Sequence, residues 1–130
     1  MDLPHAAPNG ERMVFVVDDD EAVLNSLRFS LEIDEFKVCI FRSGAELLAL
    51  SAFPESACLV LDYHLPGRDG LQTLAALRKR GVRLPAILIT SDPSDAVRGR
   101  AAAASVMIVE KPFLGNALFN AIRQAFSPTA

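Results

Sequence analysis

The chain has 130 residues, is 51% hydrophobic and carries a formal net charge of −3 at pH 7. This length suits one domain with a buried core, and the hydrophobic content excludes general disorder. Because the charge is weakly negative, no long basic cluster is present and no apolar run approaches the ~20 residues of a membrane-spanning helix, we expect a cytoplasmic protein without nucleic-acid or membrane partners.

The chain begins with a predicted tail and continues as short apolar runs that alternate with helical patterns. Residues 1–11 contain proline and glycine with little periodicity, which indicates a flexible tail before a domain at residues 12–127. Cys39 and Cys58 each lie inside an apolar run, as reduced core cysteines usually do. The runs that we predict to be strands are Met13–Val17, Lys37–Phe41, Ala57–Leu61, Ala86–Ile89 and Val106–Val109.

These strands predict the fold class. They are continuously apolar rather than alternating, which is typical of a parallel sheet that is covered on both faces. Five strands alternating with five helices indicate an α/β fold. We expect a flavodoxin-like (βα)5 three-layer sandwich, with its parallel sheet in the order 2-1-3-4-5.

The first three helices have clear boundary signals. Asp20 is the predicted N-cap of the first helix, Ser43 and Glu46 have the spacing of a capping box at the second, and Gly81 closes the third. Asp69 is expected to serve the turn at the start of the third helix. The leucines expected in these three helices are Leu24, Leu27, Leu31, Leu47, Leu48, Leu50, Leu71, Leu74 and Leu77.

The last two helices differ in strength. The fourth is predicted to open at Asp92, with Pro93 at its first position, and we expect it to be the loosest because Gly99 interrupts it and alanines 101–104 offer small contacts only. The fifth is predicted over residues 113–126. Its expected inward residues are Leu114, Leu118, Ala121, Ile122 and Ala125.

Polar side chains follow four of the five strands directly. Asp18 and Asp19 follow the first, Asp62 the third, Thr90 the fourth, and Lys111 comes just after the fifth. In parallel sheets of this kind, binding sites lie at the carboxyl ends of the strands. Two carboxylates about 4 Å apart repel by roughly 4 kcal/mol at an effective dielectric near 20, so we expect the cluster to bind a hard cation. A carboxylate can also act as a nucleophile. We therefore predict a magnesium-dependent phosphoryl site.

The chain resembles the receiver domain of two-component response regulators, which are bacterial phosphorelay proteins. The resemblance covers about residues 12–126, with its motifs in the family's order and close to its spacing. The motifs are Val17-Asp18-Asp19-Asp20-Glu21, Leu61-Asp62-Tyr63-His64-Leu65-Pro66-Gly67-Arg68-Asp69-Gly70, Ile89-Thr90-Ser91 and Glu110-Lys111-Pro112-Phe113.

The resemblance implies a phosphoacceptor and a metal site. Asp62 would receive a phosphoryl group from a histidine kinase or a histidine phosphotransfer protein. Asp18, Asp19 and Asp62, with the backbone carbonyl of His64, would hold Mg²⁺ (or Mn²⁺). Asp20 is interpreted as a helix cap rather than a further ligand.

The resemblance also assigns roles around the phosphoryl group. Thr90 would hydrogen-bond it and report its arrival, and Lys111 would bind one of its oxygens after pairing with Asp62 at rest. Pro112 is the family's usual follower of this lysine, often preceded by a cis bond. The protein would be a phosphoacceptor and not an enzyme.

The chain departs from the family pattern in two places. Ile108 stands where the family usually has tyrosine or phenylalanine, so we hypothesise that the signal passes through the Thr90 loop and the fourth helix. Ala104-Ser105 stands where family members commonly carry a glycine. The resemblance also implies that His64 and Asp92 would flank the path of the hydrolytic water. We hypothesise that they tune the lifetime of the phosphorylated state, although Asp92 is also interpreted as a helix cap.

The expected organisation is a stand-alone receiver without an output domain, present as a monomer or weak dimer. Its output protein would bind the face formed by the fourth helix, fifth strand and fifth helix. Two alternatives stay open: an adaptor that no longer accepts phosphate, and a receiver fragment of a larger hybrid kinase or transcription regulator. A flavin-binding module is disfavoured because the acids after the first strand would repel a phosphate.

Overall fold

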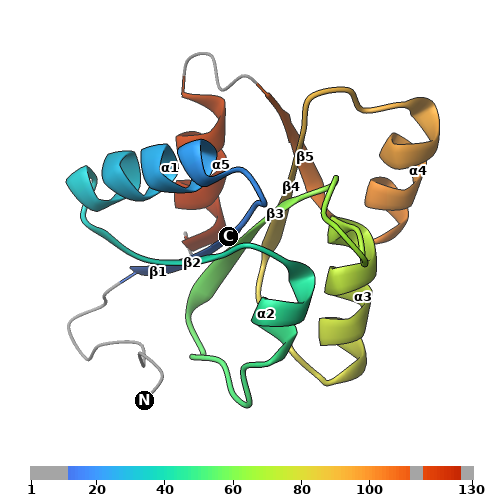
Figure 1. The fold of residues 1–130 in the computed structure, drawn as a ribbon, viewed down its shortest axis with the longest axis horizontal. Helices are drawn as coiled ribbons and strands as arrows, with labels where there is room; N and C mark the ends of the chain where they lie inside the picture. Colours follow the sequence, from blue (N-terminus) through green and yellow to red (C-terminus); the bar gives the residue numbers. More distant parts are fainter. Residues whose placement is uncertain (1–11, 112–115, 127–130) are drawn as a thin grey trace.

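The computed structural model describes residues 12–111 and 116–126, and these form a single parallel sheet with helices on both faces (Figure 1). The strand order is β2-β1-β3-β4-β5, as predicted. The strands are β1 (Arg12–Val17), β2 (Phe36–Phe41), β3 (Ala57–Asp62), β4 (Ala86–Thr90) and β5 (Met107–Glu110).

The helices divide between the two faces of the sheet. Figure 1 shows α1 beside α5 on one face and α2, α3 and α4 on the other, so the predicted three-layer sandwich is confirmed. None of the helices in the described ranges is long and apolar enough to cross a membrane. The helices are α1 (Glu21–Ile33), α2 (Gly44–Leu48), α3 (Gly70–Lys79), α4 (Asp95–Ala103) and α5 (Ala117–Phe126).

The central strand β1 supplies both cores because successive side chains of a strand point to opposite faces. Val14 and Val16 belong to the core beneath α1 and α5, whereas Phe15 and Val17 belong to the core beneath α2, α3 and α4. All four are fully buried. The continuous apolar runs of the sequence therefore have the cause that was predicted, a sheet covered on both sides.

The predicted caps of α1 and α3 are confirmed. One carboxylate oxygen of Asp20 accepts hydrogen bonds from the amides of Ala22 and Val23. Asp69 caps α3 in a complete capping box with Gln72. Gly81 follows this helix with a φ of 87°, a conformation that suits glycine.

Helix α2 is shorter than predicted, because it ends at Leu48 and leaves Leu50 outside. Its Ser43 hydroxyl accepts from the Glu46 amide as expected. The return contact differs, since the Glu46 carboxylate accepts from the amide of Arg42 rather than from that of Ser43.

Helix α4 begins two residues later than predicted, at Asp95 rather than Pro93, so the interpretations of Asp92 as its cap and Pro93 as its first residue are wrong. The physical reason is that the Ser94 hydroxyl accepts from the Val97 amide and caps the helix there. The helix also continues through Gly99 without interruption.

The remaining sequence predictions on the fold have mixed outcomes. Residue 116 is a turn and α5 begins at Ala117, so the helix starts later than position 113 would place it. The predicted tail, Leu114 and Pro112 lie outside the described residues. Both cysteines are free, Cys58 buried and Cys39 half-buried.

Candidate functional site

The candidate site lies at the carboxyl-terminal edge of the sheet, where the four predicted strand ends meet. Strand β1 pairs with β3, β3 with β4 and β4 with β5, all in parallel. Asp62 lies opposite Ile89 in this register, and Thr90 lies opposite Glu110. The sheet order therefore places the end of each of these strands beside the end of the next.

Three carboxylates form a compact cluster. Oxygen atoms of Asp18, Asp19 and Asp62 all lie within 4.8 Å of one another. Asp18 and Asp62 are buried, with 0% and 4% exposure, while Asp19 is exposed. Asp20 stays out of this cluster, because its carboxylate caps α1 and its amide donates to Asp18 Oδ1 at 2.9 Å.

Lys111 brings a positive charge to the two buried carboxylates. Its Nζ lies 2.8 Å from Asp18 Oδ2 and 3.5 Å from Asp62 Oδ1. The predicted contact with Asp62 is present, but the shorter contact is with Asp18. Burial alone would lower the pKa of Lys111, but its hydrogen bond with Asp18 and the charges of both acids outweigh burial and raise that pKa.

Asp62 is the carboxylate with the most perturbed environment. Burial raises its pKa from the ordinary 3.8 to about 6, and the negative charge of Asp18 acts in the same direction. Lys111 and a hydrogen bond from the backbone of His64 oppose this rise. Asp62 is therefore a buried carboxylate that its neighbours neutralise only in part.

Thr90, the last residue of β4, and His64, in the loop after β3, border the cluster. Thr90 is fully buried, and its hydroxyl accepts a hydrogen bond from the Asp92 amide at 3.4 Å. Its backbone carbonyl accepts from the Lys111 amide at 2.9 Å, which fixes the lysine beside β4. His64 lies two residues after Asp62, with an exposed side chain.

Ile108 lies on β5 and packs against the core beneath α3 and α4. It is half-buried, whereas its neighbour Val109 is buried on the opposite face of the sheet. The position that usually carries an aromatic ring thus holds a branched side chain with restricted rotamers.

Sequence reasoning missed one set of contacts near the site. The sequence motifs gave no role to Tyr63 or Arg100, yet the Arg100 guanidinium donates to the Tyr63 hydroxyl and pairs with Asp69. Arg100 is 37 positions from Tyr63 and 31 positions from Asp69 in the sequence, and no local periodicity connects them. The one feature of the sequence that could have pointed to these contacts is the position of Tyr63 directly after Asp62.

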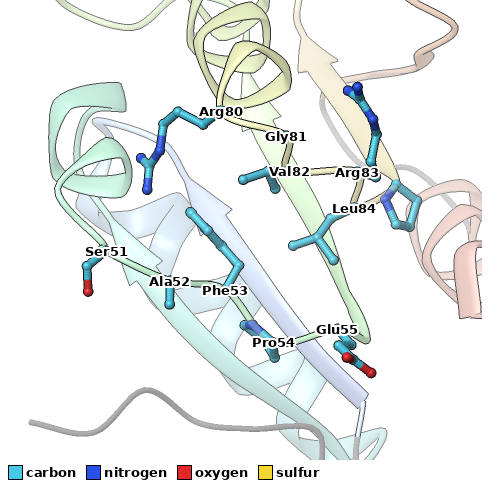
Figure 2. A pocket seen from close by; sticks show the side chains of 11 residues that line it. Ser51, Ala52, Phe53, Pro54, Glu55, Arg80, Gly81, Val82, Arg83 and Leu84 are labelled. Atoms are coloured by element: carbon cyan, nitrogen blue, oxygen red, sulfur yellow. The ribbon is translucent and has the colours of Figure 1, made fainter.

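A pocket of about 490 Å³ lies elsewhere, between the loops that precede β3 and β4. Figure 2 shows Phe53, Val82 and Leu84 along it, with Arg80 and Glu55 toward its ends. Because the strands are parallel, this pocket lies at the amino-terminal edge of the sheet, away from the carboxylates. It is not part of the candidate site.

The carboxylate cluster fits a hard divalent cation. Its three members offer oxygen ligands, of the kind that Mg²⁺ prefers, and the exposed Asp19 leaves one side open to water. Lys111 now neutralises part of the cluster and would share Asp18 with a cation. The donor set is therefore suited to a metal ion.

The chain belongs to the response regulator receiver domain family, whose sequence pattern matches residues 14–123. It is a receiver domain of the kind found in response regulators of two-component signalling. The resemblance drawn from the sequence motifs is thereby confirmed.

Two curated relatives illustrate the match. The transcriptional regulatory protein FixJ of Azorhizobium caulinodans is 34% identical over 130 residues, which is 98% of this chain and 59% of FixJ. The response regulator MprA of Mycobacterium avium is 40% identical over 81 residues, or 62% of this chain and 36% of MprA. The chain thus spans less than two thirds of the length of these relatives.

Solved structures agree with the fold. The crystal structure of FixJ-N superposes with a TM-score of 0.82 at 29% identity, covering 92% of this chain and 97% of that one. The response regulator StyR gives a TM-score of 0.81 at 34% identity, over 90% of this chain and 60% of that one. The chemotaxis protein CheY4 of Vibrio cholerae shares the fold at 19% identity, with a TM-score of 0.80 over 89% of this chain and 99% of that one.

Proposed function

We propose that this receiver accepts a phosphoryl group on Asp62 from a phosphohistidine of a histidine kinase or a histidine phosphotransfer protein. The observation that carries the proposal is the meeting of one partly neutralised, buried carboxylate with a lysine and a second buried acid. With a pKa of about 6, Asp62 is mostly ionised at neutral pH and available as a nucleophile.

The transfer is a displacement at phosphorus. An Asp62 carboxylate oxygen attacks the phosphorus atom, the new O–P bond forms as the P–N bond breaks, and the imidazole nitrogen leaves with the electron pair of that bond. The product is an acyl phosphate on Asp62. Water later attacks its phosphorus and releases inorganic phosphate, so the protein acts as a phosphoacceptor rather than as an enzyme.

The neighbouring residues position the reacting groups. Lys111 Nζ, already 3.5 Å from Asp62, binds a phosphoryl oxygen, and the Thr90 hydroxyl donates to another. Asp18, Asp19 and Asp62, with the backbone carbonyl of His64, would hold Mg²⁺ (or Mn²⁺). When bound, the cation neutralises charge on the carboxylates and on the incoming phosphoryl group.

Output follows from changed protein contacts. Phosphorylation adds negative charge beside Thr90 and Lys111, which join the site to α4 and β5, and shifts the population of conformations on the face formed by α4, β5 and α5. The receiver works in the cytoplasm as a monomer or weak dimer, and the partner on this face is another protein domain.

Acetyl phosphate with Mg²⁺ tests the proposal, with intact mass as the readout. We expect one phosphoryl group on the wild-type chain and none on Asp62→Asn. Asp20→Asn is the matched control, because asparagine also caps helices well and this residue lies outside the metal cluster. A wild-type chain that binds Mg²⁺ but gains no mass would favour the adaptor that does not accept phosphate.

A further inference from the structure

The Arg100 side chain of α4 contacts the loop that follows the phosphoacceptor. Arg100 Nη1 donates to the Tyr63 hydroxyl at 3.0 Å and lies 3.3 Å from Asp69 Oδ2. The Arg100 Cζ atom also lies 5.7 Å from the centroid of the Tyr63 ring, within reach of a cation–π contact. We call these three residues the Arg100 cluster.

The Tyr63 main chain is already fixed beside the site. Its amide donates to the Ile89 carbonyl of β4 at 2.9 Å, and its carbonyl accepts from the amides of Leu65 and Gly70. Because Tyr63 directly follows Asp62, the main chain on either side of their peptide bond is held as well. The Tyr63 side chain is the part that extends from this point to α4.

Asp69 adds a second connection. Its Oδ1 accepts from the Gln72 amide at 2.7 Å and caps α3, while its Oδ2 faces Arg100. The carboxylate therefore joins the first turn of α3 to α4. The loop that carries His64 is thus held at both of its ends, at Tyr63 and at Asp69.

Few other contacts hold α4. The helix buries only Val97 and Ala101, so its apolar contact with the sheet is small. A second arginine, Arg98, pairs with Glu110 of β5 at 3.0 Å. The side chains of Arg98 and Arg100 are similarly exposed, 53% and 44%, but they bind different elements.

We propose that Arg100 is a positioning residue that couples α4 to the occupancy of the Asp62 site. By holding Tyr63 and Asp69 it fixes the loop from which the His64 backbone reaches Asp62, and this inference rests on the proposed function of that site. A ligand that needs the loop in this position binds more tightly when the Arg100 cluster is formed. By reciprocity, the same ligand strengthens the attachment of α4.

This coupling offers a route to α4 that does not need the aromatic side chain which Ile108 replaces. A branched aliphatic side chain offers no ring to turn inward beside β5. The Arg100 cluster joins the loop after β3 to α4 without any rearrangement at that position. The signal can therefore reach α4 across the β3–α3 loop.

The test compares Arg100→Met and Tyr63→Phe with the wild type. Arg98→Met is the matched control, since it removes a similarly exposed α4 arginine that pairs with Glu110 of β5 instead of with the loop. We expect both test variants to bind Mg²⁺ about threefold to tenfold more weakly, in line with an exposed charged contact that holds a binding loop, and the control to be unchanged.

The second readout is reciprocal. Beryllofluoride with Mg²⁺ should slow hydrogen exchange over residues 95–103 in the wild type and in Arg98→Met. The slowing should be smaller in Arg100→Met and in Tyr63→Phe. A purely structural role would lower the stability of α4 in all states and leave this ligand-dependent change intact. Tyr63→Phe removes one hydroxyl only, so it decides the question even where Arg100→Met folds poorly.

The outcomes separate the two proposals. The coupling would be overturned if both test variants bound Mg²⁺ like the wild type and showed the wild-type, ligand-induced slowing of exchange in α4. Phosphorylation of the wild-type chain would then leave the phosphoacceptor role standing. A wild-type chain that gains no phosphoryl group would overturn the phosphoacceptor role, and the Mg²⁺ affinities of the variants would still decide the coupling.

Discussion

Lys111 binds Asp18 more closely than it binds Asp62. The distances from its Nζ are 2.8 Å to Asp18 Oδ2 and 3.5 Å to Asp62 Oδ1. The lysine therefore pairs mainly with Asp18, one of the three predicted metal ligands, and its effect on Asp62 is too small to offset the rise in pKa that burial causes. A cation at the cluster would have to share Asp18 with this ammonium group.

The first prediction concerns Lys111→Met. In the metal-free protein this change leaves Asp18 and Asp62 without their cation, and we expect a loss of about 3 kcal/mol in the free energy of unfolding. Mg²⁺ should restore much of this loss and should bind about tenfold more tightly than to the wild type, because the competing ammonium is gone. Urea unfolding with and without Mg²⁺ measures both effects.

Lys79→Met is the control for this experiment, since Lys79 is exposed near the end of α3 and away from the site. It should change neither stability nor Mg²⁺ affinity. Equal stability of Lys111→Met and the wild type in the presence of a chelator would contradict the structural account of the cluster.

The second prediction is a pH dependence that belongs to Asp62. Its folded pKa of about 6 lies above the ordinary 3.8, so the folded state holds this proton more tightly and stability falls as pH rises from 3.8 through about 6. Asp62→Asn removes this penalty. Without metal, we expect the variant to be more stable than the wild type by at most about 3 kcal/mol at pH 7 to 8.

The sign is checked by lowering the pH. Below pH 3.8 both the folded and unfolded wild type carry a protonated Asp62, so the advantage of Asp62→Asn should shrink toward zero. Denaturant titrations at several pH values in a chelator measure it. An advantage that grows as the pH falls would show that the carboxylate is stabilised in its charged form.

The sequence predicted most of the site because parallel strands bring their ends together. Asp18, Asp62 and Thr90 follow buried runs, so the strand order alone places them at one edge. The separation of Asp20 from the metal cluster was also predictable, since a helix pattern begins directly after it. These features depend on local pattern and topology only.

Other features depend on side-chain positions that no local pattern encodes. The shorter contact of Lys111 with Asp18 depends on how the long lysine side chain extends from the end of β5, past the ends of β4 and β3, to the end of β1. The sequence offers both Asp92 and Ser94 as caps of α4, and in the structure the Ser94 hydroxyl accepts from the Val97 amide. Ser105 adopts a φ of 57°, a conformation that its residue type does not predict.

The third prediction compares two helical glycines. A Cβ atom on Gly70 would lie 2.5 Å from the Asp62 carbonyl oxygen, so Gly70→Ala must displace the backbone of the phosphoacceptor. We expect a loss of about 2 kcal/mol in stability and weaker Mg²⁺ binding. Nothing lies within 4 Å of a Cβ atom on Gly99, so Gly99→Ala should instead stabilise the protein by about 0.5 to 1 kcal/mol.

Thermal unfolding and Mg²⁺ titration of both variants decide this comparison. Gly99→Ala should bind Mg²⁺ like the wild type, because its site is untouched. A Gly70→Ala protein with wild-type stability and Mg²⁺ affinity would mean that α3 can move away from Asp62 at no cost.

The fourth prediction concerns the lifetime of phosphorylated Asp62. Because Ser94 caps α4, the Asp92 carboxylate is not needed as the helix cap, and His64 lies on the other loop that borders the site. Both side chains are exposed and can hydrogen-bond a water that attacks the phosphorus atom. Alanine at both positions removes these groups, and we expect the half-life of the acyl phosphate to lengthen about tenfold.

Intact mass, followed over time after removal of acetyl phosphate, gives the half-life. The single variants His64→Ala and Asp92→Ala assign the effect, and Asp95→Asn, at the first position of α4, controls for a change in charge near Asp92. A double variant that loses its phosphoryl group at the wild-type rate would show that neither side chain assists the water.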